Sequence, residues 1–158
     1  MFKKLLALLI ISMGMFSSAL AFNVTFSVDL NGSGLSNASV NGTFNGWCGY
    51  CAPMSDANAD GIWEITIPLN AGTYEYKFTA NSGGNWENLT PGSSCTVTNF
   101  GFTNRLVTVT GNVTLPVVCY GFCSSCNLGC TDNTACNYDA DANVNDASCT
   151  YASLTYYV

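Results

Sequence analysis

The sequence predicts an all-β protein, in which a β-sandwich is followed by a small, disulfide-rich and irregular C-terminal segment. Three observations predict this: apolar and polar residues alternate in short runs, Gly/Asn-rich turns separate the runs, and cysteines gather after residue 118. Alternation with turns about every ten residues is typical of a sandwich, and no amphipathic helical pattern interrupts it. A sandwich of about 100 residues buries a sizeable core.

The first 21 residues have the pattern of a secretory signal peptide. A basic start at Lys3 and Lys4 precedes the apolar run Leu5 to Met15 and the small-x-small site Ala19-Leu20-Ala21. A retained N-terminal anchor is the alternative. The mature chain is therefore expected to begin near Phe22, without a membrane span, and to be secreted or held at the cell surface.

The charge balance excludes some classes of partner. The whole chain has a formal net charge of −6, and removal of Lys3 and Lys4 takes it to about −8. Only Lys77 and Arg105 then remain as cations, so electrostatic binding of nucleic acid or an anionic membrane is not expected. Such a composition suits a neutral partner.

The alternation places the expected strands in order along residues 22–120. Their ranges are 24–30, 38–44, 63–69, 74–78, 106–109 and 113–118. Pro116 cannot donate a backbone hydrogen bond, which predicts that the last strand lies at an edge or bends. Asp56 to Gly61 resembles half of an EF-hand loop, but the twelfth position is Ile67, which favours a polar hairpin turn.

All nine cysteines follow the predicted cleavage site, so a disulfide framework is expected. Cys48 to Cys51 and Cys123 to Cys126 have CxxC spacing, for which redox chemistry and metal binding are the alternatives. The odd number leaves one thiol without an intramolecular partner.

Residues 121–158 form a Cys/Asp-rich linker or partial repeat. This stretch has too little aliphatic bulk to fold alone, so disulfides, with or without a cation, are expected to order it. It resembles Cys/Asp-rich repeats of secreted marine bacterial proteins. Oxygen ligands at alternate positions make Ca²⁺ a candidate cation, and the alternative is an acidic linker without metal. The candidate ligands are Asp139, Asp141, Asn143, Asn145 and Asp146.

Three segments resemble those of a known family. They are Gly42-Thr43-Phe44-Asn45-Gly46-Trp47, Tyr74-Glu75-Tyr76-Lys77-Phe78 with Trp86 after it, and Phe100-Gly101-Phe102-Thr103-Asn104. In order and spacing they are similar to the glycogen-binding and isoamylase-N-terminal-like carbohydrate-binding modules. The resemblance implies an immunoglobulin-like, early-set sandwich.

The resemblance also implies the residues that contact sugar. Trp47 and Trp86 fall where two rings stack on glucose units, Lys77 and Asn104 where side chains bond hydroxyls, and Phe100 where an apolar side chain inserts. Stacking is chemically apt because a pyranose has an apolar C–H face.

Each assignment has a structural alternative. Trp47 is also suited to packing in the core, and Lys77 to an ion pair with Glu64, Glu75 or Glu87. The cysteines that follow Trp47, and Cys95 in the loop before Phe100, are expected either to stiffen the site or to close it.

The resulting function is a secreted, non-catalytic module that binds α-glucan-like polysaccharide by aromatic stacking, with no required cofactor. The alternative is a structural or adhesive surface module that contacts other extracellular proteins and binds no sugar. An enzyme is not expected, because the chain has no His for a Ser-His or Cys-His pair.

Overall fold

The computed structural model describes residues 20–152. Residues 1–19 of the predicted signal peptide and the last six residues of the chain lie outside this part. Between residues 20 and 152 all regular secondary structure is strand, and this part has no apolar helix of membrane-spanning length. The all-β prediction is therefore confirmed.

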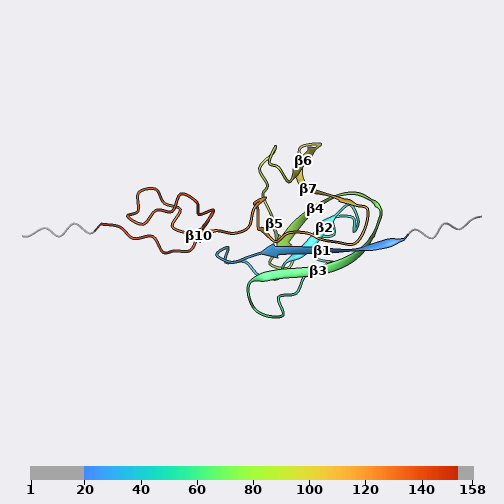
Figure 1. The fold of residues 1–158 in the computed structure, drawn as a ribbon, viewed down its shortest axis with the longest axis horizontal. Helices are drawn as coiled ribbons and strands as arrows, with labels where there is room; N and C mark the ends of the chain where they lie inside the picture. The colour runs from blue at the N-terminus through green and yellow to red at the C-terminus, as the bar shows by residue number, and fades with distance from the viewer. Residues whose placement is uncertain (1–19, 153–158) are drawn as a thin grey trace, which may run out of the picture.

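The strands form two layers and a short C-terminal pair (Figure 1). In chain order they are β1 (Ala21–Asp29), β2 (Ser39–Gly42), β3 (Ile62–Asn70), β4 (Gly72–Ala80), β5 (Asn85–Trp86), β6 (Thr96–Asn99), β7 (Phe102–Val109), β8 (Val113–Thr114), β9 (Val118–Cys119), β10 (Leu128–Gly129) and β11 (Val144–Asn145).

The first sheet is built around β1. Strand β3 pairs with it antiparallel along its whole length, from Ala21 opposite Asn70 to Asp29 opposite Ile62. On its other side β1 pairs in parallel with β8 and then with β9. Pro116 lies in the gap between β8 and β9, so the last strand is both an edge and interrupted, as the missing N–H donor predicts.

The second sheet has the order β2-β4-β7-β6, and β5 adds to the end of β4. Its strands are antiparallel, and Tyr76 of β4 lies opposite Arg105 of β7. Every residue of β2 is buried because the segment 49–55 folds over it: Val40 N donates to Ala52 O at 3.2 Å and Met54 N to Ala38 O at 2.9 Å.

The two sheets pack face to face through the alternating residues that the sequence marks as apolar. Val24, Phe26 and Val28 of β1 are fully buried, and the Phe26 and Tyr76 rings meet across the layers at 5.0 Å between centroids. Trp63 of β3 packs against this core. The arrangement is the immunoglobulin-like sandwich that the resemblance implies.

The loop between β2 and β3 contains the half EF-hand pattern. The Asp56 carboxylate accepts hydrogen bonds from the backbone N–H groups of Asp60 at 3.0 Å and Gly61 at 3.1 Å. The side chain therefore closes a polar turn, and β3 begins directly after it at Ile62.

Disulfides attach the start of the C-terminal segment to the sandwich. The pairs are Cys48–Cys51, Cys95–Cys123, Cys119–Cys126 and Cys130–Cys149, and Cys136 is free and exposed. Two of these bridges join residues on either side of the boundary predicted at residue 120. Beyond them the segment extends from one end of the sandwich, opposite the start of β1 (Figure 1).

Candidate functional site

The site lies on the outer face of the second sheet. Along β4 the side chains of Tyr76 and Phe78 point into the core, so Glu75 and Lys77 point to the opposite face. Asn104 of β7 shares that outer face, since β4 and β7 pair with Glu75 opposite Leu106. The period of two along β4 and β7 therefore places both polar side chains predicted to bond sugar on one surface.

A tight turn after β2 presents Trp47. The Asn45 carboxamide closes this turn by accepting from Gly42 N at 2.9 Å and donating to Val40 O at 3.1 Å. Phe44 packs into the core 5.7 Å from the Phe26 ring, and a Cβ on Gly42 would lie 2.5 Å from Glu75 O. The motif thus has a structural role at three positions, while Trp47 itself remains half-buried and lines a pocket.

The loop closed by Cys48–Cys51 lies beside this pocket and does not cover it. Gly49 O accepts from Asn41 Nδ2 at 2.9 Å and from Thr79 Oγ1 at 2.8 Å, which fastens the loop over β2 and β4. No disulfide cysteine is among the residues that line the pocket. The two cysteines after Trp47 therefore brace its loop.

Trp86 lies on β5, next to Trp47. Strand β5 pairs Trp86 with Thr79, and the following residue, Glu87, points inward and is buried. Trp86 in consequence points outward and is 43% exposed. The two indole rings are 6.4 Å apart between centroids and inclined at 41°.

The β6–β7 hairpin forms the other side of the pocket. Its two-residue turn, Phe100-Gly101, has φ values of +50° and +84°, the conformation that matches the twist of two paired strands. Phe100 is fully exposed at the tip of this turn, and Phe102, which is 69% exposed, lies on β7. A left-handed backbone conformation is costly for an aromatic residue, and such strained residues are concentrated at functional sites. Trp47 has the same left-handed conformation, with φ +58°.

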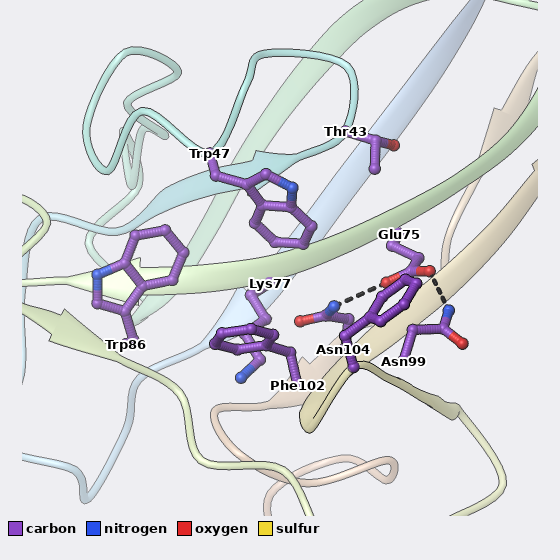
Figure 2. Close-up of a pocket in the computed structure, with 9 residues that line it drawn as sticks. Thr43, Trp47, Glu75, Lys77, Trp86, Asn99, Phe102 and Asn104 are labelled. Atoms are coloured by element: carbon purple, nitrogen blue, oxygen red, sulfur yellow. Dashed lines mark hydrogen bonds between the residues drawn. The ribbon is translucent and has the colours of Figure 1, made fainter.

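Together these elements surround a pocket of about 670 Å³. Figure 2 shows Trp47 and Trp86 on one side, Phe102 facing them, and Lys77 between. The structure brings together all five predicted sugar-contacting residues, which are Trp47, Lys77, Trp86, Phe100 and Asn104. Four further residues that the sequence pattern did not assign to the site also line the pocket, namely Thr43, Glu75, Asn99 and Phe102.

Signals for some of these four were present in the sequence. Glu75 and Phe102 lie two residues from Lys77 and Asn104 on the same strands, so the alternation already predicts a shared face. Asn99 becomes a neighbour only through the hairpin register, which pairs it with Phe102.

The site contains one cation and one carboxylate, which do not form an ion pair. Both Glu75 carboxylate oxygens accept from asparagine amides, Oε2 from Asn104 Nδ2 at 2.7 Å and Oε1 from Asn99 Nδ2. Among residues 20–152 the salt bridge is that of Arg105 with Glu87, at 2.7 Å and deeply buried. Lys77 thus keeps its ammonium free for a ligand.

The predicted calcium ligands lie in the C-terminal segment, away from this pocket. Several of their oxygens accept from nearby backbone N–H groups: Asp139 from Asp141 at 2.9 Å, Asn145 from Ala147 at 2.9 Å, and Asp146 from Ser148 at 2.9 Å. In the described part of the chain no three His, Cys, Asp or Glu side chains are grouped to hold a metal ion. Calcium binding stays a prediction from the sequence.

Two carboxyl groups of this segment, those of Asp132 and Asp146, have pKa values below the usual range. The Tyr151 hydroxyl, which donates to Asp132 at 2.7 Å, is the main cause for Asp132, and Ser148 is the main cause for Asp146.

A β-sandwich with aromatic rings around an open, neutral pocket defines a ligand-binding module, and comparison with known proteins places it further. Residues 35–92 match the family model of carbohydrate-binding module 48, the isoamylase N-terminal domain. This range includes Trp47, Lys77 and Trp86. The resemblance to this family is therefore confirmed over that range, and it supports a carbohydrate-binding role.

Among solved structures, the chain is similar to the CBM25-1 module of the β/α-amylase from Paenibacillus polymyxa. The identity is 16% over 60% of this chain and 77% of that one, with a TM-score of 0.37. No curated protein matches the chain in sequence.

Proposed function

We propose that this protein is a secreted, non-catalytic module that binds α-glucan-like polysaccharide in the pocket between Trp47, Trp86 and the β6–β7 hairpin. The observation that carries the proposal is the pair of neighbouring indole rings, 6.4 Å apart and inclined at 41°. A pyranose presents an apolar face to such a ring, and two adjacent rings accept two consecutive sugar units.

The inclination supports a curved chain over a flat one. Two rings in one plane suit a flat, ribbon-like polysaccharide, whose successive sugar faces are parallel. Rings inclined at 41° instead suit a chain whose sugar faces turn from one unit to the next, as they do in a helical α-glucan. The second aromatic wall, at Phe100 and Phe102, supports a single chain held from both sides.

The polar groups of the pocket suit a neutral, hydroxyl-rich ligand. Lys77 Nζ is a donor, and the Asn104 carboxamide retains acceptor capacity on Oδ1. The only carboxylate lining the pocket, Glu75, is held by two amides, so the pocket lacks the carboxylate pair of a glycosidase. These features support binding without catalysis.

A purely structural spacer, which is one form of the alternative, predicts rings that serve only the core. Trp86 is instead 43% exposed and Phe100 entirely so, although exposed aromatics are costly in solution and mark interaction sites. This exposure favours the ligand-binding function.

The test is the affinity of the disulfide-bonded protein for soluble starch, glycogen and maltoheptaose, with cellulose and xylan for comparison. We expect binding to the α-glucans, and a loss of about tenfold or more for Trp47→Ala or Trp86→Ala, as for buried aromatic contacts elsewhere. Tyr138→Ala is the matched control, because Tyr138 is 46% exposed on the C-terminal segment and does not line the pocket. Equal affinity of the tryptophan variants and the control would show that the pocket is not the site.

A further inference from the structure

Glu75 lines the pocket, but its carboxylate is bonded to neighbouring side chains and so suits orienting them better than contacting a ligand. Its two carboxylate oxygens each accept from a different asparagine, Oε2 from Asn104 Nδ2 at 2.7 Å and Oε1 from Asn99 Nδ2. Figure 2 shows both hydrogen bonds. The carboxylate therefore links three strands, β4, β6 and β7.

An ionised carboxylate accepts hydrogen bonds and cannot donate them. An asparagine amide beside it must turn its NH₂ group toward it and its carbonyl oxygen away. In Figure 2 the Asn104 amide nitrogen faces Glu75 and its oxygen points into the pocket. Glu75 thus selects one of the two orientations of this amide.

The oxygen that is turned into the pocket is available to a ligand. Asn104 is only 6% exposed, yet within residues 20–152 its Oδ1 accepts no hydrogen bond, and no fully buried side-chain polar atom lacks a partner. Asn104 Oδ1 therefore reaches the pocket surface as an acceptor. Lys77 Nζ, on the neighbouring strand, is a donor.

We propose that Glu75 is a positioning residue of the carbohydrate site: it holds Asn104 with Oδ1 toward the ligand, so that the pocket offers an acceptor beside the Lys77 donor. Adjacent hydroxyls on one sugar ring match this pair, because one hydroxyl donates to Asn104 while its neighbour accepts from Lys77. Asn99, as the second donor, restrains the carboxylate. The inference rests on the proposed glycan-binding function.

A double-mutant cycle of Glu75 and Asn104, measured on maltoheptaose affinity, tests whether Glu75 acts through Asn104. Glu75→Ala frees the Asn104 amide to present either end, so maltoheptaose affinity should fall roughly three- to tenfold, the scale of one hydrogen bond. Asn104→Ala should cause a similar loss. The double variant should bind no more weakly than Asn104→Ala alone, because Glu75 acts only through Asn104. Additive losses, or an unchanged affinity in Glu75→Ala, would overturn the proposal.

A second measurement does not depend on any sugar. In NMR spectra of the ligand-free protein, the Asn104 side-chain NH₂ signals should be shifted from those of a solvent-exposed asparagine and protected from hydrogen exchange. Glu75→Ala should abolish both properties. Unchanged Asn104 signals would overturn the proposal even if no glycan bound. If no glycan binds while these signals change as expected, it is the proposed function that fails.

Two further variants serve as a control and a substitute. Thr73→Ala is the matched control, because Thr73 lies on the same face of β4, bonds Thr108 at 3.2 Å and does not line the pocket; it should leave affinity and the Asn104 signals unchanged. Glu75→Gln serves if Glu75→Ala does not fold. Its new NH₂ group deprives at least one of the two amides of its acceptor, so the absence of any change at Asn99 and Asn104 would count against the proposal.

Discussion

Replacing Arg105 by Met should destabilise the protein more than any change at the glycan site. The Arg105 and Glu87 side chains are 1% and 0% exposed and form a two-point ion pair, Nε to Oε1 at 2.9 Å and Nη2 to Oε2 at 2.7 Å. Arg105 also donates to Phe122 O at 2.9 Å and lies 5.3 Å from the centre of the Phe78 ring. The pair thus joins the sandwich core to the disulfide-rich segment.

The magnitude follows from what Arg105→Met leaves behind. Glu87 would keep its hydrogen bonds from Phe78 N at 2.9 Å and Gly121 N at 3.1 Å, but would be a buried charge without a counter-ion. Removing one partner of a buried pair costs about 3–5 kcal/mol. Adding Glu87→Met removes the uncompensated charge. The loss in free energy of unfolding of the double variant should therefore be about 1–3 kcal/mol smaller than the sum of the losses of the two single variants.

The assay is urea unfolding with the disulfides intact, followed by tryptophan fluorescence. Lys77→Met is the matched control, because in residues 20–152 Lys77 forms no ion pair; it should change the free energy of unfolding by less than about 0.5 kcal/mol. A loss below about 1 kcal/mol for Arg105→Met, or strictly additive losses in the double variant, would refute the reasoning.

Two further predictions concern the hairpin tip and alkaline pH. Phe100→Asn creates the Asn-Gly pair that favours a turn with two positive φ values. The free energy of unfolding should therefore rise by about 1 kcal/mol, while α-glucan affinity falls because the exposed ring is lost. A loss of stability in urea unfolding would contradict this prediction. Burial raises the pKa of Tyr76 to about 12, with opposing effects of Arg105 and Glu87. The folded state therefore holds this proton more tightly than the unfolded state, and stability should be fully present below pH 10 and fall by about 3 kcal/mol toward pH 12. Tyr76→Phe should remove that part of the decline in alkaline unfolding curves, and an unchanged decline would exclude Tyr76 as its source.

Much of the sandwich was predictable because its strands are half-buried. Val24, Phe26 and Val28 alternate with polar residues, and this period of two identifies β1 without any tertiary information. Strand β2 was harder to define, because the segment 49–55 covers its outer face and all of its four residues are buried. Its composition is mixed because Asn41 bonds Gly49 O and Thr79 Oγ1 instead of facing water.

The candidate site shows the same division. Trp47, Lys77 and Trp86 were predicted from motif and order, and the structure places them around one pocket. Asn99 was not, because its place beside Glu75 depends on the β6–β7 register and on the pairing of β4 with β7. The sequence also could not show whether the Cys48–Cys51 loop closes the site. The loop stays beside the pocket because Gly49 O accepts hydrogen bonds from Asn41 and Thr79.

The sequence by itself determined the all-β class, the presence of disulfides and three aromatic residues of the pocket, Trp47, Trp86 and Phe100, because these follow from local period, composition and motif order. Only the tertiary structure decided the inclination of the two indole rings, the burial of Arg105 with Glu87 and the orientation of Asn104 by Glu75. Each of these depends on contacts between strands far apart in the chain, whose register no local pattern specifies.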